Sequence, residues 1–315
     1  MSNALLRHYL TKSGVTRIVS IGWDFNDPPP DLSAYDPSDC QLWIVDLPID
    51  PVRSWVNRAP ENVYWIDHHR TSILDAQNIE LVNQGKIQGV RYEGISACRL
   101  VFAYFEMRLE PEILKSYEAA PFPDEPAMVF LIGLRDVWKH RGTPMFDECN
   151  ELDLALKSIP RDEIQDALAE YLTAEGPRAA ILTDHLVAGR QISGYAKSTA
   201  AEAADRGAMV LELFDHPTED RAMKVLALNT QGHGSAVLDF MAYDLISRGG
   251  TIEALMAWAV ARDGNVNVSL YHAPGSEHID LSRMAKAYGG GGHPGACGFT
   301  TNIVNVAGWL SRMVE

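Results

Sequence analysis

The sequence is poor in cysteine and in positive charge. Its 315 residues include four cysteines, none in a CxxC pair, so no disulfide framework is indicated and a reducing compartment fits. Lys and Arg total 27 against 42 Asp and Glu, which gives a formal net charge of -15. This balance argues against a broad basic surface for long duplex nucleic acid. A short phosphorylated ligand stays open, because a bound metal ion can reverse the local sign of charge.

Long apolar runs are also missing. The longest candidate, residues 127–134, is far too short to cross a bilayer. Residues 1–14 lack the apolar core of a signal peptide. We therefore expect a cytoplasmic protein with no membrane partner.

Short apolar segments that alternate with helical segments predict an α/β protein. Strands are expected at residues 16–21, 42–45 and 63–66, and they predict a mostly parallel sheet flanked by helices. Helices are expected at residues 4–11, 51–57, 97–105, 112–119, 127–134 and 161–172. In the second half, strands are expected at residues 210–214, 224–228, 255–261 and 265–271, and helices at residues 236–247, 281–287 and 305–313.

The chain is long enough for two domains, each with its own core. We predict an N-terminal domain at residues 1–177, a long connecting helix at 178–206 and a smaller C-terminal α/β domain at 207–315, with an active cleft between the two domains. Gly189 and Gly194 argue against an unbroken connecting helix.

Carboxylates and imidazoles follow two of the predicted strands. Asp46 comes directly after one strand, and Asp67, His68 and His69 come directly after the next. In an open α/β sheet this is the edge where ligands bind. Carboxylate and imidazole ligands suit manganese, magnesium, zinc or iron. The alternative is that these are ordinary polar residues at strand ends.

Asp136 comes directly after an apolar helical stretch, within the run from Gly133 to Trp138. Taken alone, it is better explained as a helix end or an ion-pair partner than as a metal ligand.

Four consecutive glycines, Gly289 to Gly292, precede His293, Pro294 and Gly295. Such a run is costly to order, and it suits backbone that approaches a ligand closely and offers N–H groups to anionic oxygens. A plain turn between a helix and a strand is the alternative.

Two of these motifs, in this order and at this spacing, resemble the DHH phosphoesterases. Residues 65–71 (WIDHHRT) resemble the family's signature, and residues 289–296 resemble the GGGH loop of the DHH-associated C-terminal domain. Further similar segments are residues 44–47, residues 135–138, Asn229 with Ser235, and Ser269–Leu270. The resemblance spans nearly the whole chain. It implies a hydrolase of phosphate ester bonds, usually with two Mn2+ ions.

The resemblance also implies roles for individual residues. Asp46 would bridge two metal ions, and His68 and Asp136 would complete the second metal site. Asp67, His68 and His69 would form the catalytic group, with Asp67 orienting a neighbour and His69 facing the phosphate.

The resemblance places substrate contacts in the second domain as well. Gly290, Gly291, Gly292 and His293 would bind the phosphate from there. The metal-bound water would attack phosphorus in line, and the glycine loop would orient the ester.

The family's first motif, a His or Cys with two Asp residues before the first helix, is not found here. Asp24 and Asp27 come too late in the chain to match it. A late start and a lost motif both explain this. Both predict that one metal ion or none is held and that activity is reduced or absent. A second departure is Tyr271, where many relatives carry an Arg as a phosphate contact. The change suggests a substrate less dependent on a terminal phosphate, or a ligand held through stacking. A sheet-facing aromatic is the alternative interpretation.

Three functions compete. The first is a phosphoesterase that acts on a short oligonucleotide, a nucleotide or polyphosphate. The second is a catalytically impaired protein that still binds a nucleotide or phosphate. The third is a structural role without a ligand, which leaves the glycine run without a purpose. A homodimer is compatible with all three.

Overall fold

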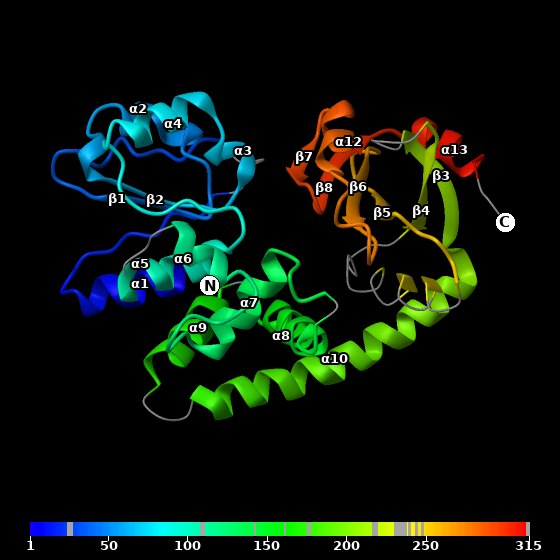
Figure 1. The fold of residues 1–315 in the computed structure, drawn as a ribbon, viewed down its shortest axis with the longest axis horizontal. Coiled ribbons are helices and arrows are strands. Elements are labelled where there is room, and N and C mark those ends of the chain that lie inside the picture. Colours follow the sequence, from blue (N-terminus) through cyan, green and yellow to red (C-terminus); the bar gives the residue numbers. More distant parts are fainter. Residues whose placement is uncertain are drawn as a thin grey trace. The chain divides into compact units, whose positions relative to one another are not determined.

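The structure is a computed structural model that describes residues 1–315 except 24–27, 108–110, 142, 161, 175–177, 216–219, 230–237, 239–240, 243–244, 247–248 and 313–315. The chain forms two compact units, Met1–Gly189 and Arg190–Glu315 (Figure 1). The α/β class expected from the sequence is confirmed in both.

The first unit is built on a short parallel sheet. β1 (Leu42–Val45) pairs with β2 (Val63–Ile66) in parallel, with Val45 opposite Ile66. Residues 88–92 continue the sheet beyond β2, because the Trp65 N–H donates to the Gln88 carbonyl and the Asp67 N–H to the Val90 carbonyl. Both strands begin and end where the sequence predicts.

Helices supply the rest of the first unit. They are α1 (Ser2–Lys12), α2 (Arg53–Val56), α3 (Arg70–Ile73), α4 (Ala76–Asn83), α5 (Ala97–Glu106), α6 (Pro111–Ser116), α7 (Ala127–Asp136), α8 (Phe146–Ser158) and α9 (Ile164–Thr173), with 3-10 turns η1 (Asp50–Val52) and η2 (Pro60–Asn62). α3, α4 and α8 were not predicted. One core joins α1, α5, α7, α8 and α9.

A buried ion pair ties α5 to the segment before α7. The Arg99 guanidinium lies 2.8 Å from Glu125, and both side chains are fully buried. Arg99 also donates to the carbonyls of Tyr117 and Ala120, so its charge is fully engaged. A Cβ at Gly133 of α7 would meet the Arg99 side chain at 2.3 Å. The absence of a side chain at Gly133 therefore lets α7 pass close over Arg99, three residues before α7 ends at Asp136.

The strand predicted at residues 16–21 is wrong. These residues have no helix or strand, and Val19 and Ile21 are 53% and 46% exposed. Ile18 packs against the core, and Ser20 is held by Arg7 and Asn3 of α1. A β-branched run forms a strand only beside a neighbour that accepts its hydrogen bonds, and no described strand pairs with this one.

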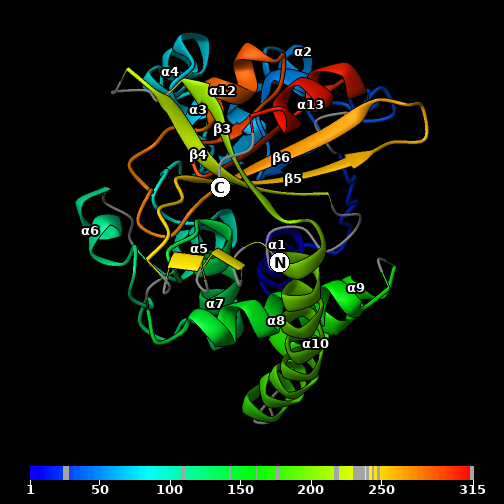
Figure 2. The same cartoon turned by 90° about the vertical axis from the view of Figure 1, so that its right-hand side faces the viewer.

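The second unit is a six-stranded mixed sheet in the order β3-β4-β5-β6-β8-β7, all antiparallel except β4 with β5. The strands are β3 (Met209–Asp215), β4 (Ala222–Asn229), β5 (Ala254–Val260), β6 (Val266–His272), β7 (Gly291–His293) and β8 (Ala296–Thr301). Helices α12 (Ser282–Ala287) and α13 (Ile303–Leu310) pack on one face (Figure 2). Of the helix predicted at residues 236–247, the described residues are helical, and Leu238, Met241 and Ala242 cover the other face.

The glycine run is a hairpin rather than a plain loop. β7 pairs with β8, and Gly291 lies opposite Gly298. Gly289 has a φ of +78°, and a Cβ at Gly290 would meet the Gly298 carbonyl at 2.1 Å. Gly292 has a φ of +133° and a similarly close neighbour. Gly291 alone of the four has neither a positive φ nor a neighbour within 4 Å.

α10 (Arg178–Gly207) is one helix, and the boundary of the two units falls within it. Gly189 is buried against α8, where a Cβ would meet the Glu151 carbonyl oxygen at 1.8 Å. Gly194 is exposed and has open space around it. Among the described residues, no helix is long and apolar enough to span a membrane.

Replacing either of these two glycines of α10 with alanine should change the free energy of unfolding, but in opposite directions. Gly189→Ala forces α10 away from α8 and should lower the free energy of unfolding by about 1–3 kcal/mol. Gly194→Ala only improves helix propensity and should raise it by about 0.5–1 kcal/mol. Thermal unfolding followed by circular dichroism measures both. Equal effects of the two variants would show that the contact with Glu151 does not constrain α10.

Candidate metal centre

The parallel register of β1 and β2 brings two acids to one edge of the sheet. Val45 lies opposite Ile66, so Asp46 and Asp67 are the next residues of the two strands. The Asp46 N–H donates to the Ile66 carbonyl at 3.0 Å, which continues the ladder by one bond. Asp46 has a φ of +63°, a left-handed conformation that turns the chain out of the strand at this point.

His68 joins this edge to α7. Its imidazole Nε2 lies 3.1 Å from Asp46 Oδ1 and 3.4 Å from Asp136 Oδ2, and the His68 side chain is 2% exposed. Asp136 is the last residue of α7, so the helix end positions its carboxylate. One donor atom from each of the three residues lies within 4.8 Å of the others. We call Asp46, His68 and Asp136 the acid–histidine cluster.

The charges of the acid–histidine cluster shift its ionisation. Burial opposes the charged form of His68, but the hydrogen bond to Asp46 and the charge of Asp136 outweigh it and raise the pKa of His68. Burial likewise opposes ionisation of Asp46, yet His68 and His69 lower the pKa of that carboxyl overall. Although the Asp136 side chain is 45% exposed, the protein around its carboxylate and the negative charge of Asp46 raise the pKa of Asp136 to about 6.

Asp67 holds His69. The fully buried Asp67 carboxylate accepts the backbone N–H groups of His68 and His69 through Oδ1, and the same oxygen lies 2.6 Å from His69 Nδ1. The second oxygen, Oδ2, is buried and has no hydrogen-bond partner within the described part of the chain. Beside an ionised Asp67, this contact favours the His69 tautomer that carries its proton on Nδ1.

Ser2 is a member of this site that the sequence reasoning missed. Its hydroxyl donates to Asp46 Oδ2 at 3.2 Å, and the Ser2 side chain lies almost completely buried at the start of α1. The first turn of α1 therefore lies against the acid–histidine cluster. A serine next to a start residue carries no recognisable signal, and only the packing of α1 on α5 and α9 brings it here.

The predicted residues of the first unit come together, namely Asp46, Asp67, His68, His69 and Asp136. Gly290, Gly291, Gly292 and His293 belong to the second unit and lie in the β7–β8 hairpin and just before it. Their contact with the phosphate, and the cleft between the domains, stay predictions. Asp24, Asp27 and Ser235 lie outside the described residues. Tyr271 packs against the core on the face of the second sheet that Leu238 covers.

The acid–histidine cluster fits a hard or borderline divalent cation. It offers two carboxylates and one imidazole without a thiolate, a donor set that suits manganese, magnesium, zinc or iron. A second group of donor atoms, from Asp46, Asp67 and His69, shares Asp46 with the first. The first fits better, because in the second group Asp67 Oδ1 already accepts two backbone N–H groups in addition to its contact with His69 Nδ1.

Comparison with solved structures bears on the fold. The DHH domain of a protein described as a member of a ribosomal protein family matches with a TM-score of 0.50 at 13% identity, over 86% of this chain and 68% of that one. The chain has the fold of a DHH-domain protein. The resemblance read from residues 65–71 is thus confirmed at the level of this DHH fold.

Two other solved structures also match. A pGpG-specific phosphodiesterase, PggH, from Vibrio cholerae gives a TM-score of 0.47 at 14% identity over 98% of this chain and 93% of that one. An exopolyphosphatase-related protein from Bacteroides fragilis gives 0.37 at 16% identity over 82% and 65%. No family model and no curated protein matches the sequence.

The raised pKa values predict a pH-dependent metal affinity in this DHH fold. His68 and Asp136 bind a cation only when deprotonated, so protons compete with the metal below their folded pKa values. We expect the Mn2+ affinity to fall at least about tenfold from pH 8 to pH 5.5, as measured by calorimetry. His68 should contribute more to this pH dependence than Asp136, because the His68 side chain is buried whereas that of Asp136 is partly exposed.

The variant His68→Asn separates the two contributions. It should bind Mn2+ more weakly and with a shallower pH dependence, since only Asp136 still titrates. Unchanged binding in this variant, or a pH-independent affinity in the parent protein, contradicts the assignment of the acid–histidine cluster.

Proposed function

We propose that the chain is a DHH-family metal-dependent phosphoesterase that acts on a small phosphorylated substrate, such as a short oligonucleotide, a nucleotide or polyphosphate. The observation that carries the proposal is the position of His68 Nε2 between the carboxylates of Asp46 and Asp136. The DHH fold and the motif resemblance support it. The formal net charge of -15 favours a small substrate over a long duplex.

Asp46, His68 and Asp136 would hold the cation, and the resemblance favours Mn2+. When bound, it supplies a low-pKa water and neutralises charge on the phosphate. Asp67 fixes the His69 ring, whose Nε2 then accepts or donates a proton at the phosphate oxygens. The buried carboxylate of Asp67 keeps this orientation without occupying a metal position.

The second unit would supply substrate contacts through the β7–β8 hairpin. The hairpin itself requires glycine at positions 290 and 292, because a Cβ there would meet close neighbours. It does not require glycine at position 291, where a Cβ would meet nothing within 4 Å. We assign Gly291 to the close approach of an anionic oxygen, with His293 as a further donor two residues on.

A second candidate function is a phosphate- or nucleotide-binding protein with little turnover. The observation that favours it is the contact of the Ser2 hydroxyl with Asp46 Oδ2, which engages one oxygen of the carboxylate that would bridge two ions. A carboxylate engaged in this way suits one ion better than two.

A chromogenic phosphodiester, bis-p-nitrophenyl phosphate, tests turnover with and without Mn2+. We expect hydrolysis that requires the metal, and a loss of about 100-fold or more in kcat/KM in Asp46→Asn. Asp67→Asn should lose about 10- to 100-fold, because His69 is released while the acid–histidine cluster persists. Asp39→Asn is the control, as it removes the same charge from an exposed position of the same unit.

Three results separate the candidates. Metal-dependent turnover supports the enzyme. Phosphate binding without turnover supports the impaired protein. Neither activity nor binding, in protein that holds Mn2+ by calorimetry, contradicts both.

The glycine assignment has its own test. Gly291→Ala should leave the unfolding temperature unchanged and raise KM at least about threefold, because a methyl group displaces the substrate from the backbone. Gly308→Ala is the matched control, since that exposed glycine of the same unit also has open space around it. If KM stays unchanged in both variants, Gly291 has no contact with the substrate.

A further inference from the structure

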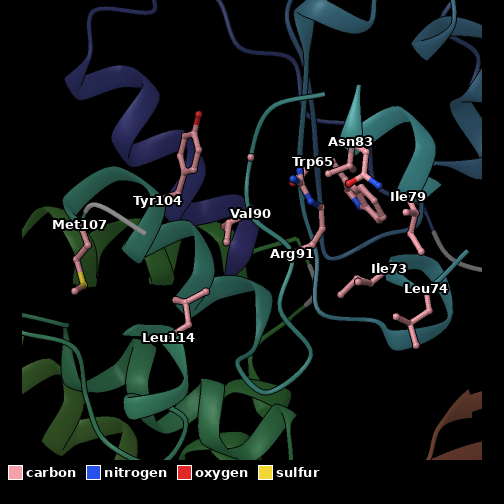
Figure 3. Close-up of a pocket in the computed structure, with 12 residues that line it drawn as sticks. Trp65, Ile73, Leu74, Ile79, Asn83, Val90, Arg91, Tyr104, Met107 and Leu114 are labelled. Carbon is pink, nitrogen blue, oxygen red and sulfur yellow. The ribbon is translucent and has the colours of Figure 1, made fainter. Parts of the chain in front are cut away.

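The first unit contains a cavity of about 620 Å³, lined by α3 and α4 on one side and by α5 and α6 on the other. Figure 3 shows Val90 and Arg91, from the segment that pairs with β2, between these two groups of side chains. None of the metal-site residues Asp46, Asp67, His68, His69 and Asp136 lines it.

The walls of this cavity are mostly aliphatic, and part of them faces solvent. Leu74 is 57% exposed and Ile79 is 39% exposed, while Ile73, Val82 and Met107 continue the apolar lining. Exposed apolar side chains that gather around a hollow mark a place where an apolar group is bound.

Arg91 gives the cavity a positive charge. One guanidinium nitrogen, Nη1, donates to the carbonyls of Trp65 and Gln88 at 3.2 and 2.9 Å, and the group lies 5.7 Å from the Trp65 ring. These contacts hold the guanidinium but bring no opposite charge. No described residue that lines the cavity carries a carboxylate, and no described acid pairs with Arg91. Burial lowers the pKa of Arg91, as expected for a cation without a counter-charge.

Two neutral polar groups complete the lining. The Tyr104 side chain is partly buried, and burial raises the pKa of its hydroxyl, so it stays a neutral donor. Asn83 ends α4 at the exposed mouth of the cavity. A ligand with one anionic head and an apolar body would use both the polar and the apolar parts of this lining.

We propose that this cavity binds a small amphipathic anion, an aliphatic chain that carries one carboxylate or one phosphate. The planar fork of Arg91 suits both head groups, because each offers two oxygens side by side. A bare inorganic anion would leave the aliphatic walls unused, and a neutral chain would leave the charge of Arg91 uncompensated. The proposal is independent of the phosphoesterase proposal, since the two sites share no residue.

Calorimetry on the full chain tests the proposal with octanoate and octyl phosphate as probes. Acetate, inorganic phosphate and octanol supply the head without the chain and the chain without the head. We expect saturable binding of at least one of the two amphipathic probes, at least about tenfold tighter than that of the three controls. Binding of octanol as tight as that of octanoate overturns the role of Arg91, and no binding of either amphipathic probe overturns the site.

A pair of variants locates the binding. Asn83→Asp places a negative charge at the mouth of the cavity and should weaken octanoate binding at least about fivefold. Asn57→Asp makes the same change at an exposed position directly after α2, outside the cavity, and should leave binding unchanged. Both variants should fold, which the unfolding temperature checks. An equal loss in both variants shows a general charge effect and contradicts the assignment to this cavity.

Discussion

The parallel pairing of β1 with β2 determines where the chemistry of the first unit lies. Each strand has four residues, and their register ends them together, so Asp46 and Asp67 leave the sheet at one edge. An antiparallel pair would send the two acids to opposite edges. The DHH fold depends here on a very small piece of sheet, supported by segment 88–92 on the far side of β2. Everything that α7 and α1 contribute is arranged around that edge.

The packing of α7 brings the third member of the acid–histidine cluster, Asp136, to this edge of the sheet. α7 passes over the buried Arg99–Glu125 pair, because Gly133 leaves room for the arginine, and it ends at Asp136 within reach of His68. Breaking such a pair by removing one partner would leave a buried charge, which typically costs about 3–5 kcal/mol. The contact with the ion pair thus lies three residues before Asp136 along α7 and fixes the path of that helix. The stability of the core and the geometry of the site are coupled through this one helix.

The sequence was informative where the local pattern and the global fold agree. The short apolar runs predicted both strands, and the polar residues directly after these runs predicted that Asp46 and His68 lie together. It failed at residues 16–21, where the local pattern is that of a strand but no described strand lies beside it. It also could not reveal Ser2 or Arg91, because their roles come from contacts between distant segments. Gly189 misled for the same reason, since its use is the contact with α8.

Backbone strain marks the same edge of the sheet. Of the four described non-glycine residues with a positive φ, Asp46 is a member of the acid–histidine cluster, and Trp138 lies two residues after Asp136. Trp138 is held by Arg135 and Arg141, whose guanidinium groups lie 4.5 and 4.3 Å from its ring. Conformations of this kind cost about 1–3 kcal/mol each and persist only where the surroundings enforce them. Both strained residues lie at or close to the carboxylates of Asp46 and Asp136, which face His68. The strain therefore lowers stability at the positions that set the direction of these two side chains. That is the arrangement expected if their geometry, rather than the packing of the core, is what these residues serve.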